Sequence, residues 1–469
     1  MTDIRIDGES ADLTPGATLT LERFNPMMDF ETIQGSRVYG FELPDTPTNR
    51  RLLGYFYQPQ VEYQARKFRC EKYEYGQMVE QGFVMIQEVK PTGFSLYFTQ
   101  NLGEIFGDRQ TILLSELNLH TAPVAPVLNP NHLTDALAWP TIQNDGFYGN
   151  QGVSGWNGLM NEYTAGAYNA NARVPMYFLS WVYRTFGALT GWSFTGQFWQ
   201  DPDLLRLLLY NTYSTDGLAT ITSNNHLPGL TLGGLTIDLR KLFNLFIEFD
   251  VRRNVCTMDF ADRVLATADV LDWTDKAAPD HVKAPELVNR LELSYDIDGN
   301  DGLLKPIPAS MDTYTTAETT LNKGGTSLPI RSRLSTVLTD AATGRAVTQQ
   351  PGVSTLNKDN KGGASPKLVF WNGLSGSGQP VATNAQGGRS LLWRGTNNLV
   401  NVGYSKYEAF RSNTFRVTKL VYLTPGDLAR FSFRQKVHIR GVNYVVGSLK
   451  AVLGAGRQTI LTEVLLFRA

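Results

Sequence analysis

Residues 435–467 read QKVHIRGVNYVVGSLKAVLGAGRQTILTEVLLF, three runs of largely alternating apolar and polar side chains separated by turn residues. Apolar residues at every second position are typical of strands that bury one face. The turns are Arg440-Gly441-Val442-Asn443 and Gly454-Ala455-Gly456-Arg457. Together with the run at 416–422, the pattern predicts an antiparallel β segment over residues 416–469.

The other end of the chain shows the same period. Ile4 and Ile6 alternate with polar residues before the turn at Asp7-Gly8. Further runs with this pattern follow at 18–21, 66–75, 78–89 and 94–98. Residues 1–120 are therefore expected to form a small antiparallel barrel or sandwich.

The middle of the chain is predicted to hold three units. Residues 121–172 are rich in Pro, Asn, Gly and Tyr and are expected to be a loop-rich aromatic connector. Residues 173–305 are expected to be an α+β domain. Residues 306–415, rich in Thr, Ser, Gly and Asn, are expected to be a loop-rich β insertion, with exposed loops at 358–367 and 373–388.

Helices are expected only in the α+β domain. Apolar residues at three- and four-residue steps predict a helix over 173–192, with Gly191 at its end. Asp201 and Pro202 favour a second helix over 201–210, and a third is expected over 237–246. The fold class is thus α+β and mainly β, with antiparallel barrel or sandwich domains formed by the two chain ends around a central α+β insertion.

Charge and composition exclude several classes of protein. The 43 basic and 44 acidic side chains leave a net charge of −1 without a basic stripe, so no specific nucleic-acid site is expected. No apolar run is long enough to span a membrane, and the first residues do not form a signal peptide. Cys70 and Cys256 are expected to be buried free thiols.

No catalytic, cofactor or metal site is expected. The acidic stretch 296–302 lacks the Gly and the Glu that a calcium loop needs at its sixth and twelfth positions, and is expected to be a polar turn. The carboxylate pairs Glu42 with Asp45 and Asp269 with Asp272 are read as surface residues. Nothing resembles a metal-binding histidine pair, a nucleophile elbow or a phosphate loop.

Aromatic side chains gather in one stretch of the connector, between Asn and Gly residues. They could stack on sugars or anchor a subunit interface, where Tyr and Trp are enriched. We expect residues 144–172 to be mobile in the isolated protein and ordered in the assembly by contact with another chain. The residues are Phe147, Tyr148, Trp156, Tyr163 and Tyr168.

Residues 35–54 resemble an N-terminal signature of tail proteins from phages and prophages of Bacteroidetes. In that signature a strand ends in a Leu-Pro-x-Thr-x-x-Asn turn, here residues 43–49, and leads into two basic residues, here Arg50 and Arg51. The hairpin pattern at 66–89 and the central stretches at 174–196 and 237–251 resemble the same proteins.

The resemblance implies a structural role in a tail tip or baseplate. The preferred interpretation is an oligomeric hub that closes the tail tube. A trimer is expected, with the tail tube or a distal tail protein, the tape-measure protein and peripheral tip or receptor-binding proteins as partners. The protein would be made in the bacterial host cytoplasm and reside in the virion tail. Arg50 and Arg51 would face another subunit or an acidic surface.

Three alternatives remain open at this point. The first is a distal tail ring protein that carries adhesins and is expected as a hexamer. The second is a host-glycan-binding adhesin that uses the aromatic residues of the connector. The third is a tail-associated hydrolase, for which the sequence offers no nucleophile–base pair.

Overall fold

The computed structural model describes residues 2–32, 36–62, 67–99, 109–250, 253–357, 366–454 and 459–469. Most of the predicted turn at 454–457 and of the predicted loop at 358–367 lies outside these ranges. So do Arg66 of a predicted strand and Arg252 of a predicted hairpin turn.

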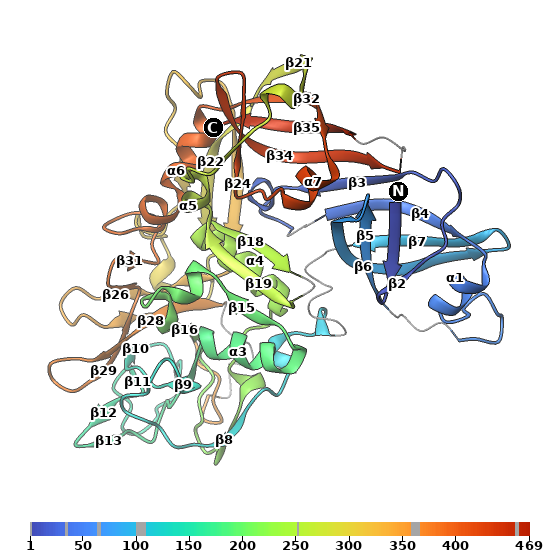
Figure 1. The fold of residues 1–469 in the computed structure, drawn as a ribbon. Coiled ribbons are helices and arrows are strands. Elements are labelled where there is room, and N and C mark those ends of the chain that lie inside the picture. Colours follow the sequence, from blue (N-terminus) through green and yellow to red (C-terminus); the bar gives the residue numbers. More distant parts are fainter. Residues whose placement is uncertain are drawn as a thin grey trace.

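Strands from the two ends of the chain and from residues 270–285 build a 13-stranded sheet, and the mainly β fold class is confirmed (Figure 1). Its N-terminal strands are β1 (Thr2–Ile6), β2 (Glu9–Ser10), β3 (Leu19–Phe24), β4 (Ser36–Pro44), β5 (Phe68–Glu74), β6 (Gln77–Lys90) and β7 (Gly93–Thr99). Its other strands are β20 (Val270–Asp272), β21 (Ala277–Pro285), β32 (Phe415–Leu423), β33 (Lys436–Ile439), β34 (Val442–Leu453) and β35 (Ile460–Arg468).

The sheet runs in the order β2-β1-β5-β6-β7-β4-β3-β34-β35-β32-β21, and β33 and β20 continue from β34 as a branch. The seam between the two chain ends is the antiparallel pair β3–β34, which places Leu19 opposite Leu453 and Phe24 opposite Ser448. Inward side chains from both ends, such as Leu21 and Ala451, share one hydrophobic core. We call this 13-stranded sheet the platform.

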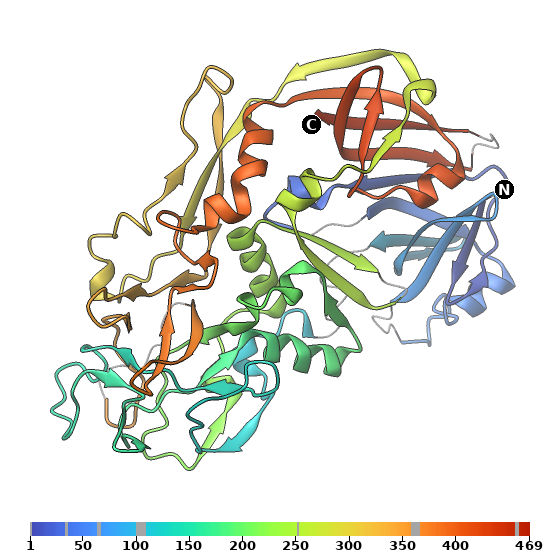
Figure 2. The ribbon, with the colours of Figure 1, turned by 60° about the vertical axis from the view of Figure 1, so that its left-hand side comes forward.

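The central region packs against the platform and extends away from it (Figure 2). A six-stranded sheet joins β25 (Ser335–Thr336), β28 (Lys367–Leu374), β16 (Leu207–Tyr210), β14 (Met176–Phe178) and β9 (Leu137–Ala138), with β29 (Pro380–Thr383) beside β28. These strands come from all three predicted middle segments. The segments that the prediction divides at residues 172 and 305 therefore share one sheet.

Smaller sheets complete the central region. The hairpin β18 (Leu245–Asp250) and β19 (Val255–Phe260) takes β15 (Ser193–Thr195) as a parallel neighbour. An arm is formed by β22 (Val288–Tyr295), β23 (Tyr314–Thr315) and β24 (Thr326–Ser332). Short pairs are β8 (Thr121–Pro123) with β17 (Thr220–Thr222), β12 (Tyr163–Thr164) with β13 (Ala167–Tyr168), and β30 (Ala385–Gln386) with β31 (Arg389–Ser390). The last small sheet joins β10 (Ile142–Gln143), β11 (Leu159–Met160), β26 (Leu338–Thr339) and β27 (Ala346–Val347).

The helices differ from the prediction in their bounds. The helix predicted from residue 173 begins only at Leu179, because β14 precedes it. This helix, α3 (Leu179–Thr190), ends at Gly191 with φ of 75°, a conformation that glycine adopts without strain. Helix α4 (Leu232–Phe243) begins at Leu232 rather than at 237, because Thr231 caps it by accepting a hydrogen bond from Gly234 N.

The prediction of a helix over 201–210 is wrong. Only a short 3-10 turn at Leu204–Arg206 forms there, and strand β16 follows. All four β16 residues are buried between β14 and β28. A short apolar run fits a buried strand as well as a helix, and the sheet partners decide between them.

In the described ranges, four further helices are present that the sequence does not predict. They are α1 (Pro47–Leu52), α5 (Ala261–Leu265), α6 (Ser405–Ser412) and α7 (Pro425–Arg430). A π-helical turn at Val400–Tyr404 leads into α6. Tyr404 and Tyr407 are buried there, in the core beneath α4 and α5, so part of the segment predicted as a loop-rich insertion is core.

Candidate interface surfaces

The predicted basic pair lies on helix α1, at a corner of the platform. Strand β4 ends at Pro44, and the Thr46 side chain caps α1 by accepting a hydrogen bond from Asn49 N at 3.2 Å. The Arg50 guanidinium lies 2.5 Å from the Asp45 carboxylate and 4.5 Å from the Tyr57 ring centroid. The hydrogen bond from Arg50 lowers the pKa of Asp45.

Arg51 also has a carboxylate partner within the chain. Its guanidinium lies 2.5 Å from the Glu9 carboxylate, and both side chains are more than half exposed. Exposed ion pairs stabilise a fold little, because water screens them and two long side chains must be ordered. Arg51 can therefore exchange Glu9 for an acidic surface on another subunit. The interface role of Arg50 and Arg51 stays a prediction.

Two of the five predicted aromatic anchors belong to the chain's own core. Phe147 and Tyr148 are 0% and 1% exposed. The Tyr148 hydroxyl donates to Asp216 at 2.6 Å and accepts from Ala172 N at 2.7 Å. A methyl group at Gly352 would collide with the Phe147 ring. The structure thus corrects the selection of Phe147 and Tyr148 as surface anchors: their burial is complete without a partner.

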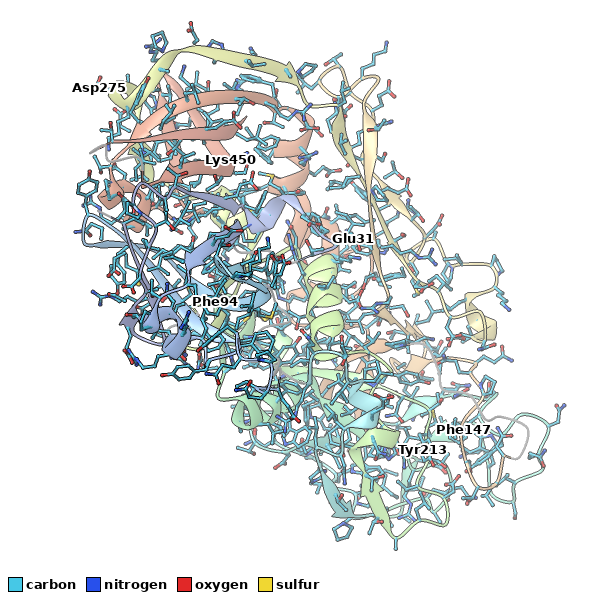
Figure 3. The ribbon with its side chains drawn as sticks, turned by 90° about the vertical axis from the view of Figure 1, so that its right-hand side faces the viewer. Glu31, Phe94, Phe147, Tyr213, Asp275 and Lys450 are labelled. Carbon is cyan, nitrogen blue, oxygen red and sulfur yellow. The ribbon has the colours of Figure 1, made fainter. Side chains whose placement is uncertain are left out.

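The other three aromatics are half-buried. The Trp156 ring lies 5.0 Å from the Tyr148 ring and covers the edge of the core. Tyr163 and Tyr168 face each other across the β12–β13 hairpin with ring centroids 5.1 Å apart. Phe147 lies at the end of the molecule opposite Lys450 of the platform (Figure 3). An aromatic surface at this far end would consist of Trp156, Tyr163 and Tyr168, and it stays a prediction.

The platform has an outward face that carries an apolar row. Leu461 on β35 lies opposite Tyr422 on β32, and Val452 follows the last β34 residue paired with β35; the three side chains are 42–48% exposed. The next row along the strands is charged on β3, β34 and β35, with Glu22 opposite Lys450 and Lys450 opposite Glu463, and ends in the exposed Leu420 of β32. A row of large apolar side chains beside a row of charges is typical of a surface that meets another protein.

The platform is also open at its edges. In the described part of the chain, β21 pairs only with β32, and β2 pairs only with β1. Most of β21 is exposed, and Val282 within it is 68% exposed. An edge strand presents unpaired backbone N–H and C=O groups, which can pair with a strand of another chain.

Sequence reasoning missed the apolar row on the platform. The signal was available in β32, where Leu420 to Leu423 form a continuous apolar run instead of alternating. In a half-buried strand, such a run places apolar side chains on the solvent face. Val452 and Leu461 break the alternation in the same way.

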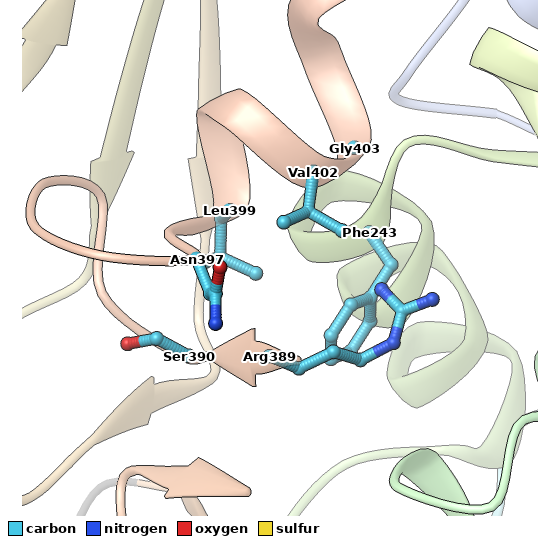
Figure 4. A pocket seen from close by; sticks show the side chains of 7 residues that line it. All are labelled: Phe243, Arg389, Ser390, Asn397, Leu399, Val402 and Gly403. Carbon is cyan, nitrogen blue, oxygen red and sulfur yellow. The ribbon is translucent and has the colours of Figure 1, made fainter. Parts of the chain in front are cut away.

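Pockets lined by described residues range from a water-sized cavity to two larger surface hollows. The pocket in Figure 4, lined by Phe243, Arg389, Ser390, Asn397, Leu399, Val402 and Gly403, has a volume of about 10 Å³, enough for no more than one water molecule. Two surface hollows of about 320 and 360 Å³ lie on the platform, one beside Thr18 and Phe41 and the other beside Trp273 and Asp427.

Among the described residues, no group of three or more His, Cys, Asp and Glu side chains could hold a metal ion. Within the same ranges, no helix is both long and apolar enough to cross a membrane. Cys70 and Cys256 are buried free thiols, as predicted. The acidic stretch is not a uniformly exposed turn, since Asp298 and Asp301 are 4% and 2% exposed.

No protein-family model and no curated protein matches the chain. Its structure is similar to the 43 kDa tail protein of prophage MuSo2 from Shewanella oneidensis, with a TM-score of 0.40 and 9% identity over 99% of this chain and 95% of that one. A tail protein from Neisseria meningitidis gives 0.40 and 11%, over 99% and 95%. Prophage tail protein gp18 from Listeria monocytogenes gives 0.35 and 8%, over 98% and 94%. TM-scores of this size do not establish a shared fold.

Proposed function

We propose that the chain is a structural, non-enzymatic component of a phage-type tail tip, and that it forms the oligomeric hub that closes the tail tube. One observation carries the proposal: the two chain ends meet in a single 13-stranded platform that remains open at β2 and β21. The resemblance of residues 35–54 to tail proteins points to the same role.

Open edges favour a ring. Pairing the β21 edge of one copy with the β1–β2 edge of the next would satisfy the free backbone groups of both. Such a head-to-tail contact either closes into a ring or grows into a filament, and a soluble hub requires closure. Three copies would give the trimer expected of a hub, with the apolar row of the platform available to a neighbouring tail protein.

The two ends of the molecule suggest how the partners are divided. The platform would meet the tail tube or the distal tail protein, with the tape-measure protein at the closed lumen. The far end, with Trp156, Tyr163 and Tyr168, would contact peripheral tip or receptor-binding proteins. The chain would reside in the virion tail.

The test is the mass of the purified full chain in solution, measured by mass photometry. A species of three times 52.2 kDa is expected. A hexamer would favour the distal tail ring protein instead, and a clean monomer at micromolar concentration would contradict both readings.

A matched pair of variants tests the β21 edge. Val282→Lys places a charge on the exposed edge strand and should reduce the trimer fraction. Leu321→Lys is the control, because Leu321 is similarly exposed at 65% but lies outside the platform. Equal trimer fractions in the two variants would show that β21 is not at the subunit contact.

A further inference from the structure

A lysine and an aspartate form an ion pair in the interior of the central region. Lys367 is the first residue of β28, and Asp301 caps the short 3-10 turn Gly302–Leu304. Lys367 Nζ lies 2.5 Å from Asp301 Oδ2, and the two side chains are 0% and 2% exposed. Burial lowers the pKa of the Lys367 ammonium. The pair is thus held in contact and shielded from water.

The two oxygens of Asp301 have different surroundings. Oδ1 accepts hydrogen bonds from two backbone groups, Gln349 N at 3.0 Å and Leu303 N at 3.1 Å. Oδ2 accepts from Lys367 Nζ and from the Thr348 hydroxyl, the latter at 2.7 Å. Two N–H groups on one oxygen stabilise the negative charge that develops when a nucleophile attacks a carboxyl carbon. The other oxygen has donors that can supply protons to it.

We propose that Lys367 and Asp301 join in an intramolecular isopeptide bond. The Lys367 ammonium first passes a proton to Asp301 Oδ2, and the neutral amine then attacks Asp301 Cγ. An N–C bond forms, and the bond from Cγ to Oδ2 breaks. Two of the three ammonium protons leave with Oδ2 as water, and the third stays on the amide nitrogen. The reaction needs no oxidant, metal or further reactant. Contact between the reacting groups replaces a bimolecular encounter.

Removal of charge favours the product. A buried ion pair retains the cost of taking two charges out of water, whereas an amide is neutral. Asp298, 4% exposed, lies near enough for its charge to act on Lys367. Its carboxylate accepts a hydrogen bond from Gln350, and Thr348 Oγ1 lies 3.1 Å from Gln350 Oε1. Asp298 and Gln350 therefore position Thr348 against the reacting carboxyl group.

The bond would connect β28 of the six-stranded sheet to the segment that follows β22, 66 positions apart in the chain. It would tie two parts of the central region between which the chain runs through strands β23 to β27. Such a link resists unfolding even when the surrounding side chains separate.

The test is mass spectrometry of the full chain, incubated at neutral pH and then denatured. The intact mass should fall below the sequence mass by one water molecule. Proteolysis should release a branched peptide that links Lys367 to Asp301. Lys276 and Asp427 are the internal control, because their ion pair of 2.7 Å is partly exposed and should give no branch.

Variants distinguish isopeptide formation from other reactions that release water. Lys367→Arg keeps the charge but cannot complete this reaction, so its mass should equal its sequence mass. Thr348→Val should slow the mass loss. Dehydration of Asp301-Gly302 or Asp298-Gly299 to a cyclic imide would give the same mass without a branch and would persist in Lys367→Arg. Mass loss without a branched peptide would overturn the proposal. So would a wild-type chain with its full sequence mass and with Lys367 and Asp301 on separate peptides. Both results come from the wild type, so the test holds even if a variant fails to fold.

Discussion

Asn25 Nδ2 donates a hydrogen bond of 2.8 Å to the carbonyl oxygen of Val446, 421 positions later in the chain. The Asn25 backbone N–H donates to the neighbouring Gly447 oxygen, also at 2.8 Å, and its side-chain oxygen accepts from Met27 N. The residue is 2% exposed. One buried amide thus fixes the end of the β3–β34 seam, where the two ends of the chain meet.

Replacing Asn25 by Ala should destabilise the platform. Val446 O and Met27 N would each lose a partner in the interior, which costs about 1–3 kcal/mol per buried unsatisfied group. Denaturant unfolding of the isolated chain measures the loss. Asn118→Ala is the control, because Asn118 also makes a side-chain hydrogen bond but is exposed. Equal stabilities of the two variants would contradict the role given to Asn25.

His226 should make the stability of the central region depend on pH. Its imidazole is buried beside Tyr213, with ring centroids 5.4 Å apart, and burial lowers its pKa from 6.5 to about 3. Between these values the unfolded chain binds a proton that the folded chain does not, so the free energy of unfolding falls as the pH falls. From pH 7.5 to pH 5 the loss should be about 2 kcal/mol.

The measurement is the free energy of unfolding at both pH values. In His226→Gln this dependence should be smaller by that amount, whereas His281→Gln, at an exposed position of β21, should keep it. If the pH dependence is the same in the wild type and in His226→Gln, burial does not lower the pKa of His226 in the folded chain, and the prediction is wrong.

Charge reversal at Arg50 and Arg51 should prevent assembly while leaving the chain folded. Arg51 is held by an exposed ion pair to Glu9, and Arg50 by a partly exposed ion pair to Asp45 and by contact with the Tyr57 ring. Their loss should change the unfolding curve little, whereas an acidic partner surface would be repelled. The measurements are the unfolding curve and the trimer fraction of Arg50→Glu with Arg51→Glu. Arg253→Glu, with its side chain 80% exposed, is the control, and an unchanged trimer fraction in the double variant would exclude the predicted role.

Much of the platform could be predicted from the sequence because its signal is local. Ile4 and Ile6, or the alternation in β35, identify a half-buried strand without knowledge of its partner. The run Leu204 to Leu209 carries no such alternation, so the sequence alone could not distinguish the buried strand β16 from a helix.

The buried polar groups could not be predicted in the same way. Asp301 and Lys367 are 66 positions apart, and nothing in either local sequence indicates the other. Phe147 and Tyr148 were placed on the surface because they lie among Asn and Gly residues. The structure buries them through distant residues, Asp216 and Gly352, whose contribution the local composition does not reveal.

Hydrogen exchange should show where the connector is ordered in the isolated chain. Asn144 and Asn161 are fully buried, and their side chains bind backbone groups: Asn144 bridges to Gln350, and Asn161 bridges to Pro140 and Val174. These bonds, with the burial of Phe147 and Tyr148, hold residues 144–149 and 159–161 against the core that they share with the six-stranded sheet. Amides that exchange only through opening of a packed core are protected most strongly.

The backbone amides of Asn144, Phe147 and Asn161, which all donate hydrogen bonds within the chain, should therefore be strongly protected in isolated subunits. Ala165 and Gly166, at the exposed tip of the β12–β13 hairpin, should exchange fast in isolated subunits and become protected only on assembly if Tyr163 and Tyr168 meet a partner. Fast exchange at all five amides in the isolated chain would support the expectation that residues 144–172 are ordered only by contact with another chain.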